Sequence, residues 1–563
     1  MKVWVKGEGE VTLGQADFIA SGGEGTVYGK GNTAYKVYAD PTRAVPADKL
    51  RELSGIRPAN IIKPEKMLVD KAGKPLGYTM RFVQDAMPLC QLFPRVFRER
   101  NGIDAVRIGA LVEQLRNGVQ AVHDAGVLIV DLNEMNFLVR KDFRDLYFID
   151  VDSYQTPHYP ATALMLSVRD WQVQNNDWTQ FSDWYSFAIV AFTLFTGIHP
   201  YKGKHPSLKG FEERMKASVS VFNADVQVPK AAYPIDVIPS AYRDWMYAVL
   251  EGGERSAPPG TVGRVTFTPH VKVLTGTNVT ISELREMVEA IIGHVEHDGR
   301  EVIWTKDAVW VDNQCMFGAV GGVRGVGFTP RSNLPVLAGV SMTTGRLKLL
   351  DLAHKTSIPL DMRADDAMAY GGTVYIRAKN KILRLVLTDL GPKIVASVQL
   401  ASSCLEHATQ MFEGVVLQSL LGRAYATVFP EAGKSYQCSF PDLDSYRIVD
   451  AKFDGHVLVV VGFQSKTGTY DRFVFRLSSD FTSYDVRKVE DIQPAGLNFV
   501  TLPSGICVAI DEEERLEVFS SRKGSVGMKK VDDPAVRSDM RLGKKGGQVV
   551  FPQNNKLFGM SLR

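Results

Sequence analysis

The sequence predicts an α+β domain of two lobes followed by an all-β domain of repeated units. Three observations predict this order. Residues 1 to about 85 alternate between apolar and polar side chains and are broken by glycine turns, which is typical of strands. From about residue 104 apolar residues recur at three- and four-residue spacings, which indicates helices. After about residue 297 short alternating runs return between turn residues. We therefore expect lobes at about 1–85 and 86–270, and the all-β domain at 298–563.

Composition and charge exclude several classes of protein. Of the 563 residues, 45% are hydrophobic and 23% are charged, which is ordinary for a globular protein and suits two to four domains. The net charge of +3 does not favour nucleic-acid binding. The five cysteines form no CxxC pair, so neither a disulfide framework nor a zinc site is predicted. The N-terminus lacks the apolar core of a signal peptide, and the longest apolar run, 185–198, is short for a membrane span. We expect a soluble, cytoplasmic protein of bacterial or phage origin with no membrane contact.

The first lobe carries a glycine-rich hairpin. IASGGEGTVYGKGNTAYKVY (19–38) reads as a strand, a glycine turn, a second strand and a third strand that holds Lys36. Glycines such as Gly22, Gly23 and Gly25 let backbone N–H groups approach phosphate oxygens, and a lysine on a neighbouring strand neutralises them. The pattern suits a triphosphate site, although glycine hairpins are also common as plain turns.

The second lobe is predicted to be helical. One apolar stripe over 106–122 predicts a long helix that ends near Gly126, and short strands follow it. An apolar helix is then expected over 182–197. Further helices are predicted over 209–218, 239–251 and 281–294. The last would form a helical linker, 271–297, that fastens the two domains, since its amphipathic pattern is unlike a loose Gly/Ser tether.

The all-β domain shows a repeated phrase in which a glycine precedes alternating apolar residues. The marker glycines are Gly372, Gly414, Gly455, Gly505 and Gly547, and the steps between them are 42, 41, 50 and 42 residues. A period of about 40–45 residues with several strands per unit is typical of a β-propeller. We expect about six blades, with a pair of β-sandwiches as the alternative.

The segment IVDLNEMNFLV (129–139) places two polar residues in an apolar stretch. Asp131 and Asn136 are five residues apart, and Asp150 follows at the end of the apolar strand LYFID. In-line phosphoryl transfer needs a carboxylate near the attacking hydroxyl and oxygen ligands that hold metal ions against the phosphates. Because Asp and Asn also form ordinary turns, both interpretations stay open for this segment alone.

Taken in order, these segments resemble the protein kinases over about residues 15–270. The glycine hairpin and Ala34-Tyr35-Lys36 are similar to the kinase glycine loop and its Ala-x-Lys strand. Asp131 and Asn136 match the spacing of the kinase catalytic loop, and Asp150 stands where the metal-binding aspartate belongs. The resemblance implies an α+β bilobal protein-kinase-like domain, followed here by an all-β propeller-like domain.

The resemblance also implies a role for individual residues. Lys36 would bind the α- and β-phosphates of ATP and pair with Glu52, which could equally be an exposed helix residue. Asp183, in FSDWYSF, would bond the backbone of the catalytic loop, although Asp is also a good helix N-cap. The implied ATP-contacting residues are Gly22, Gly23, Gly25, Val27, Ala34, Lys36, Glu52, Met80 and Phe82. The implied catalytic residues are Asp131, Lys36 and Asn133, and the implied Mg²⁺ ligands are Asn136 and Asp150.

Several positions depart from the kinase pattern. Ala20 replaces the first loop glycine, Ile129-Val130 replaces His-Arg, and Asn133 replaces the catalytic-loop lysine. The triplet that begins at Asp150 ends in Asp152 instead of glycine, and residues 153–181 contain no Ala-Pro-Glu. The missing arginine makes control through activation-loop phosphorylation unexpected, and the missing lysine removes a positive charge near the transferred phosphate.

The resemblance implies an ATP- and Mg²⁺-dependent serine/threonine protein kinase whose propeller-like domain recruits protein substrates or partners. Two alternatives are open. The departures above favour a nucleotide-binding pseudokinase that serves as a scaffold. A kinase-like transferase that acts on a small molecule, or that transfers a nucleotide, would carry the same residues.

Overall fold

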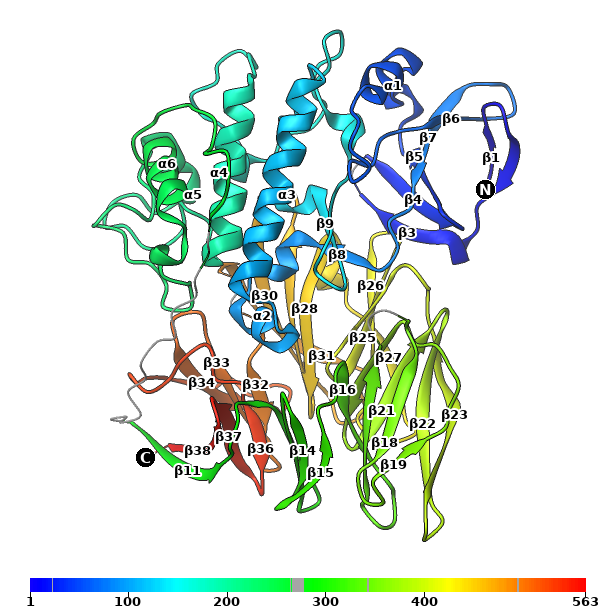
Figure 1. Ribbon diagram of the computed structural model, residues 1–563, viewed down its shortest axis with the longest axis vertical. Coiled ribbons are helices and arrows are strands. Elements are labelled where there is room, and N and C mark those ends of the chain that lie inside the picture. The colour runs from blue at the N-terminus through cyan, green and yellow to red at the C-terminus, as the bar shows by residue number, and fades with distance from the viewer. Residues whose placement is uncertain (23, 264, 266–277, 342–343, 494–495, 563) are drawn as a thin grey trace.

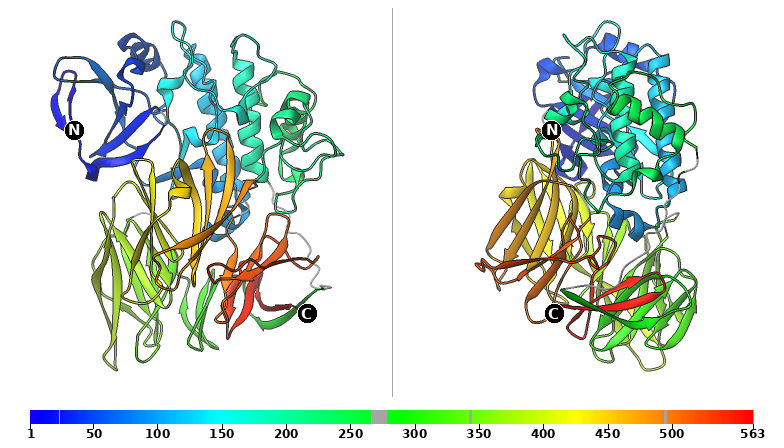
Figure 2. Two further views of the ribbon diagram at one scale, coloured as in Figure 1. Left: turned by 180° about the vertical axis from the view of Figure 1, so that it is seen from behind. Right: turned by 90° about the vertical axis from the view of Figure 1, so that its left-hand side faces the viewer.

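The structure is a computed structural model that describes residues 1–22, 24–263, 265, 278–341, 344–493 and 496–562. An N-terminal half, residues 1–263, lies above a second half that runs from Val279 to Leu562 (Figure 1). The N-terminal half holds one curved sheet and all the α-helices of the described chain, and the second half is built of strands. Both views in Figure 2 show the two halves in contact along a broad boundary.

The predicted fold class is wrong for the chain as a whole. Strands make up 41% of the structure and helices 17%, so the chain is mostly β rather than an α+β domain beside a β domain. The described residues form six α-helices, and their strands fall into nine separate sheets. The first sheet is a half-barrel and does not build a clear α+β lobe. Helical stripes are conspicuous in the sequence, but long irregular segments and short 3₁₀ turns separate the helices they form.

The N-terminal half begins with a seven-stranded sheet in the order β2-β1-β6-β7-β5-β4-β3. Its strands are β1 (Lys2–Val5), β2 (Gly9–Thr12), β3 (Phe18–Ser21), β4 (Gly25–Lys30), β5 (Thr33–Tyr38), β6 (Lys66–Val69) and β7 (Pro75–Arg81). Side chains alternate across a strand, so Tyr35 and Val37 enter a small core on one face while Lys36 and Tyr38 point to the other. This alternation directs Lys36 toward the rest of the N-terminal half.

Helices and a small sheet complete the N-terminal half. The helices are α1 (Ala47–Ser54), α2 (Arg95–Asn101), α3 (Ala105–Asp124), α4 (Gln180–Thr196), α5 (Phe211–Ala217) and α6 (Ser240–Leu250). The small sheet has the order β10-β9-β8, with β8 (Ala86–Pro88), β9 (Phe137–Arg140) and β10 (Leu146–Phe148). The helices predicted near 106–122, 182–197, 209–218 and 239–251 are confirmed as α3, α4, α5 and α6.

The helix ends follow ordinary capping chemistry. Asp104 caps α3 by accepting a hydrogen bond of 2.8 Å from the Arg107 N–H. Gly197 ends the apolar helix α4 with a φ of 78°, a left-handed conformation that favours glycine. Within the part of the chain that the structure describes, no helix is both long and apolar enough to cross a membrane.

Seven four-stranded antiparallel sheets, and not about six units, make up the second half. In chain order their strands are β12 (Ile291–His297), β13 (Arg300–Thr305), β14 (Ala308–Val311) and β15 (Gln314–Gly318); β16 (Val323–Phe328), β17 (Pro335–Val340), β18 (Leu347–Asp351) and β19 (Thr356–Ile358); β20 (Asp366–Tyr370), β21 (Thr373–Ala378), β22 (Lys381–Asp389) and β23 (Ile394–Ser403); β24 (Thr409–Phe412), β25 (Val415–Leu420), β26 (Arg423–Val428) and β27 (Tyr436–Ser439); β28 (Tyr446–Asp454), β29 (Val457–Gln464), β30 (Thr469–Leu477) and β31 (Tyr484–Ile492); β32 (Phe499–Thr501), β33 (Ile506–Ile510), β34 (Arg515–Ser520) and β35 (Met528–Asp532); and β36 (Gly543–Lys545), β37 (Gln548–Gln553), β38 (Lys556–Leu562) with β11 (Val279–Glu286).

The seven sheets close into a ring, which we call the sheet ring. Neighbouring sheets pack on one another, and β36 contacts both β32 and β12, so the last sheet meets the first. β11 and β38 come from opposite ends of the second half and pair antiparallel, with Val279 opposite Leu562. Five marker glycines could not reveal this number, because the sheets β12–β15 and β16–β19 contain none of them.

The helix predicted over 281–294 is wrong. Its residues lie in β11 and β12, which pair with β38 and β13. The remainder of the expected helical linker, 271–277, lies outside the described residues. The polar and apolar residues of this segment fit both periods, and pairing with the distant strand β38 outweighs their helical preference.

One close approach of helix to strand positions the chain that leads to Asp150. Gly118 of α3 faces the ring of Phe148, and a Cβ at this position would lie 2.2 Å from two ring carbons. Phe148 ends β10 and stands two residues before Asp150. Only glycine therefore allows α3 to lie this close to the strand.

We predict that Gly118→Ala destabilises the N-terminal half by about 1–3 kcal/mol through overpacking against Phe148. Its neighbour Asn117 is exposed, and Asn117→Ala should change the free energy of unfolding by less than about 0.5 kcal/mol. Urea denaturation followed by circular dichroism measures both. Equal stabilities of the two variants would show that the helix can move away from the strand at no cost.

Candidate functional site

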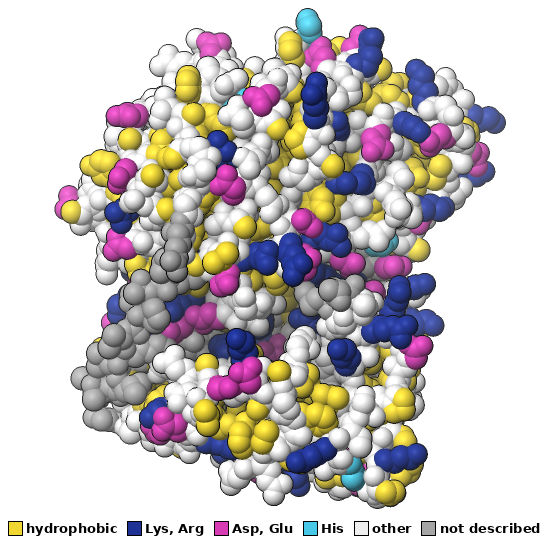
Figure 3. Space-filling view, in the orientation of Figure 1, with side chains coloured by type: hydrophobic (Ala, Val, Ile, Leu, Met, Phe, Trp, Pro, Cys, Tyr) yellow, Lys and Arg dark blue, Asp and Glu magenta, His cyan; other side chains and the backbone are white. Residues whose placement is uncertain are grey.

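A cavity of about 2210 Å³ lies between the curved sheet, the helices and the sheet ring. Its wall includes the glycine hairpin, Lys36, Asn136 and Asp150, and it continues to residues of the ring. The surface view shows the boundary between the two halves as a hollow with acidic and basic side chains along it (Figure 3). Of the predicted phosphate-handling residues, the cavity wall therefore contains the glycine hairpin, Lys36, Asn136 and Asp150, whereas Asp131 lies behind it.

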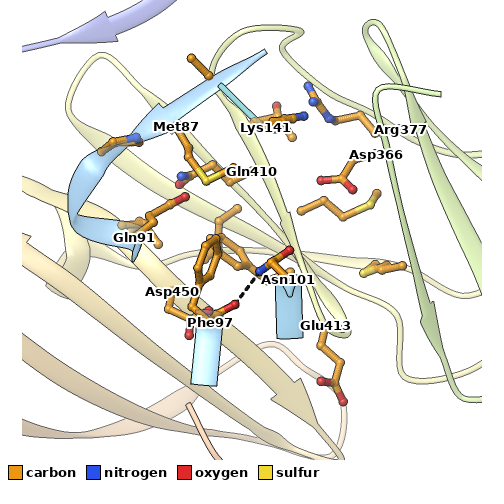
Figure 4. Close-up of a pocket in the computed structure, with 18 of the residues that line it drawn as sticks. Met87, Gln91, Phe97, Asn101, Lys141, Asp366, Arg377, Gln410, Glu413 and Asp450 are labelled. Atoms are coloured by element: carbon orange, nitrogen blue, oxygen red, sulfur yellow. Dashed lines mark hydrogen bonds between the residues drawn. The ribbon is translucent and has the colours of Figure 1, made fainter. Parts of the chain in front are cut away.

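The part of the cavity between the halves is polar on both sides (Figure 4). Gln91 and Lys141 belong to the N-terminal half, and Asp366, Arg377 and Gln410 belong to the ring. The Lys36 end of the cavity and this second part are continuous. The ring thus forms one wall of the space that opens from the predicted site.

Lys36 is the centre of a buried group of charges. Its ammonium lies 2.6 Å from Asp150 Oδ1, 2.8 Å from Asp152 Oδ2 and 3.1 Å from Glu24 Oε2. The Lys36 side chain is 7% exposed and that of Asp152 is 3% exposed, whereas Glu24 and Asp150 are near 30%. An ammonium has three protons to donate, and each of these carboxylates occupies one.

The neighbouring strands satisfy the remaining oxygens of Asp152. Tyr38 and Tyr78 donate hydrogen bonds of 2.5 and 2.6 Å to its two carboxylate oxygens. Lys49 of α1 donates to the Asp152 carbonyl at 2.7 Å. The register of β5 and β7 places Lys36 opposite Tyr78, so one row of the sheet supplies both groups. Asp152 is therefore held by the curved sheet and by α1 together.

Charge and burial act against each other in this group. Burial alone would lower the pKa of Lys36, but Tyr78, Asp152 and Asp150 outweigh it and raise the pKa well above its usual value. Burial would raise the pKa of Asp152, yet the Lys36 charge and the hydrogen bonds to its carboxylate lower it. Burial and the nearby Asp152 raise the pKa of Asp150 despite Lys36. Lys36 and Asp152 thus stay charged, and Asp150 is the carboxylate that is least stabilised as an anion.

Asp183 of α4 holds the loop that carries Asp131. Asp183 is fully buried, and its two carboxylate oxygens accept hydrogen bonds of 2.8 Å from the Ile129 and Val130 N–H groups. His123 lies 2.9 Å from the same carboxylate. Val130 has a φ of 63°, a conformation that costs a β-branched residue about 1–3 kcal/mol. The role that the resemblance implied for Asp183 is confirmed, and the bonds compensate the strain.

Asp131 itself is 6% exposed and hydrogen-bonded within the loop. Its Oδ1 accepts a bond of 2.7 Å from the Met165 N–H, and Asn136 Nδ2 lies 3.3 Å from its Oδ2. Burial raises the pKa of Asp131. Asn133 is buried and turns inward, where its side-chain oxygen accepts from the Met135 N–H at 2.9 Å. Asn133 therefore shapes the turn, while Asn136 lines the cavity.

Oxygen ligands for a hard cation are available at one side of the cavity. Glu24, Asp150 and Asp152 place carboxylate oxygens within 4.8 Å of one another, but each of these carboxylates already bonds the Lys36 ammonium. The Asn136 carbonyl accepts from the Ile149 N–H at 2.9 Å, which brings Asn136 beside Asp150. Among the described residues, the side-chain oxygen of Asn136 and the second oxygen of Asp150 have no hydrogen-bond partner. Carboxylate and carboxamide oxygens suit Mg²⁺, so the residues present fit that ion.

The structure places most predicted site residues around the cavity. The residues that line it are Gly22, Gly25, Val27, Ala34, Lys36, Met80, Phe82, Asn136 and Asp150. Gly23 lies outside the described residues. Glu52 is not brought to Lys36, because its carboxylate meets His158 at 2.6 Å. The expected Lys36–Glu52 pair is thus replaced by Glu24, Asp150 and Asp152.

Sequence reasoning missed four members of the group, Glu24, Tyr38, Lys49 and Tyr78. Tyr38 follows Lys36 by two residues in a strand, so its shared face could have been inferred. Glu24 stands between two loop glycines, and the glycine pattern itself assigns no role to its carboxylate. Lys49 and Tyr78 reach Asp152 across 103 and 74 residues, and no local pattern announces such contacts.

The comparisons with known proteins give one weak similarity. The chain resembles a probable serine/threonine-protein kinase of Dictyostelium discoideum, with 25% identity over 147 residues. The match covers 24% of this chain and 11% of that relative, so most of the relative's length has no counterpart in it. No protein-family model matches the chain. At the coarsest level, the similarity indicates a kinase-like function.

We predict that Lys36→Met destabilises the protein by about 3–5 kcal/mol at neutral pH, because it leaves buried carboxylates without their ammonium. Lys2 forms a 2.7 Å ion pair with Glu10 on the same sheet but is 63% exposed, so Lys2→Met should cost less than about 1 kcal/mol. The midpoint of urea unfolding reports both effects.

The same difference should depend on pH. The lowered pKa of Asp152 contributes stability that is present above pH 3.8 and is lost as the pH falls through its folded-state value. Lys36→Met removes that contribution, so the difference in free energy of unfolding between the wild type and the variant should become smaller below pH 3.8. A gap that stays constant with pH would mean that the ammonium is not what stabilises this carboxylate.

Proposed function

We propose that the protein is an ATP- and Mg²⁺-dependent phosphotransferase that acts as a serine/threonine protein kinase. The observation that carries the proposal is the 2.6 Å contact of Lys36 with Asp150, two residues 114 positions apart that meet at one cavity. Asp131 and Asn136 lie on the adjoining loop. The similarity to a probable serine/threonine-protein kinase supports the same chemistry.

Each residue has a separate task in this proposal. Lys36 and the backbone of the glycine hairpin bind phosphate oxygens, and the apolar side chains of Val27, Ala34 and Met80 enclose the adenine. Asn136 and Asp150 would hold Mg²⁺, which when bound neutralises charge on the β- and γ-phosphates. Catalysis at such a site consists mostly of positioning and of stabilising charge.

Asp131 would take the proton from the acceptor hydroxyl. The acceptor oxygen forms a bond to the γ-phosphorus, the bond from that phosphorus to the β,γ-bridging oxygen breaks, and ADP leaves. The acceptor proton passes to Asp131, whose pKa is raised by burial and whose carboxylate is therefore a better base than an exposed one. The Asn136 amide bonds the Asp131 carbonyl at 3.0 Å and so couples acceptor and metal positions.

A second function, nucleotide binding without transfer, is favoured by one specific observation. All three donors of Lys36 are engaged by carboxylates, and the Met165 N–H occupies one oxygen of Asp131. A nucleotide must displace Glu24, the most weakly held of the three, before Lys36 can bind phosphate. A protein that binds nucleotide and stops there would serve as a scaffold.

We predict that Asp131→Asn lowers the rate of phosphoryl transfer by a factor of about 10²–10⁴, the usual contribution of a general base, with little effect on nucleotide affinity. Transfer from γ-labelled ATP to a generic protein substrate gives the rate, and mass spectrometry of the product identifies the modified residue. The matched control is Asp124→Asn, an exposed aspartate on α3 that should transfer at the wild-type rate.

The outcomes separate the candidate functions. If the wild type transfers no faster than Asp131→Asn while calorimetry shows ATP binding, the scaffold function holds instead. A product that carries a nucleotide, and not a phosphate, would replace phosphoryl transfer by nucleotide transfer.

A further inference from the structure

One sheet of the ring, β28–β31, reaches the loop that carries Asp131. Tyr470 of β30 donates a hydrogen bond of 2.7 Å to Glu134 Oε1. Tyr470 is 6% exposed and Glu134 is 9% exposed, so the bond is closed to solvent. Glu134 stands between Asp131 and Asn136 in the sequence. A residue of the second half thus holds the middle of the predicted catalytic loop.

The contact belongs to a row that crosses three strands. In the strand register Arg447 lies opposite Phe463, and Phe463 lies opposite Tyr470. Arg447 donates to the Met135 carbonyl at 3.4 Å, and Phe463 is fully buried in the core that the two halves share. Figure 2 shows this sheet, in orange, rising from the ring toward the helices. Backbone pairing fixes the row, so the loop is held against a rigid support.

A second contact from the same sheet reaches the segment whose Met165 N–H bonds the Asp131 carboxylate. Gly468, in the turn between β29 and β30, lies against Ser167 and Met165, and a Cβ there would be 3.1 Å from Ser167 Oγ. The Met165 N–H is the donor to Asp131 Oδ1 at 2.7 Å. Gly468 has a φ of +69°, so an alanine would be strained as well as crowded. The turn therefore supports the segment that holds the Asp131 carboxylate.

We infer that the sheet β28–β31 is part of the transfer site, and that Tyr470 is a positioning residue that acts on Asp131 and Asn136 through Glu134. The inference rests on the proposed function. It gives the ring a direct part in the reaction. The sheet holds the loop that carries Asp131, and it also holds the segment whose Met165 N–H bonds the Asp131 carboxylate.

The chemistry of Tyr470 and Glu134 suits a hydrogen bond that stays formed. Burial, with the Glu134 charge beside it, raises the pKa of Tyr470 well above its usual value, so the hydroxyl remains a donor. A buried carboxylate that loses its donor is costly, because water does not replace the bond. Removal of the Tyr470 hydroxyl should consequently shift the loop rather than leave it in place.

The test compares Tyr470→Phe with Tyr484→Phe. Tyr484 lies in β31 of the same sheet, and its hydroxyl bonds Asp442 at 2.8 Å on an exposed surface, so the control removes a similar hydroxyl far from the loop. Tyr470→Phe should lower kcat roughly tenfold and leave KM for ATP unchanged. In hydrogen–deuterium exchange of the apoprotein, peptides that cover 129–136 and 163–168 should exchange faster in Tyr470→Phe and not in Tyr484→Phe.

Glu134→Gln provides the conservative rescue. Its amide oxygen still accepts from Tyr470, so kcat and exchange should stay close to wild type, and Glu134→Gln combined with Tyr470→Phe should lose no more than Tyr470→Phe alone. Gly468→Ala tests the second contact by exchange over 163–168. Its control is Gly524→Ala, which has a φ of +82° but no described atom within 4 Å of the added Cβ.

Exchange decides the inference independently of activity. Equal exchange in Tyr470→Phe and Tyr484→Phe over 129–136 overturns it, and so does a rise in KM for ATP with kcat unchanged. If exchange responds as expected but the wild type transfers no faster than Asp131→Asn, the ring supports the loop and the proposed transfer function fails.

Discussion

The ion group around Lys36 is the interaction on which the site depends. Lys36 belongs to the curved sheet, whereas Asp150 and Asp152 follow β10 on the other side of the cavity. Charges removed from water are costly unless every donor and acceptor is paired, and a group of this kind tolerates little movement. The sheet, α1 and the chain after β10 must therefore keep fixed relative positions, which is what a site for a highly charged substrate requires.

Asp183 stabilises the loop of Asp131 by the same principle, since it is a buried charge whose hydrogen bonds are all made within the protein. A fully buried carboxylate is stable there because two backbone N–H groups and His123 surround it. These bonds hold Val130 in a left-handed conformation that its side chain disfavours. The strain lies directly before Asp131, so the bend that presents this residue is created by the core and not by the local sequence preference.

The sequence predicted which residues gather at the cavity better than it predicted the fold. The five-residue spacing of Asp131 and Asn136 and the position of Asp150 are local features, and residues that share a short loop or strand end remain close in space. Lys36 could be joined to them only through a resemblance, and its pairing with Glu52 did not survive because His158 takes that carboxylate. Contacts such as Tyr78 with Asp152 depend on strand register, which no single segment specifies.

The errors in the fold have a common cause. The period of the 281–294 segment predicts a helix, yet the pairing of residues 281–286 with β38 joins the two ends of the second half. The predicted number of sheets is too low for a related reason, since this segment supplies β11 and most of β12, and the sheets β12–β15 and β16–β19 contain none of the five marker glycines. The chain as a whole is mostly β, because nonlocal strand pairing, and not helical periodicity, organises most of its residues.

The shared core explains why the ring cannot be treated as an independent attachment. One continuous apolar cluster contains residues of α3 and α4 together with Val459 and Phe463 of the ring. Around it, Lys202 pairs with Asp491 at 2.6 Å and Gln91 bonds the Val449 carbonyl at 3.1 Å. Separating the halves would expose this apolar surface and leave buried polar groups unpaired, which favours the arrangement of the ring and the loop of Asp131 that the structure shows. A surface that faces the cavity from the ring therefore has a fixed relation to the carboxylates of the candidate site.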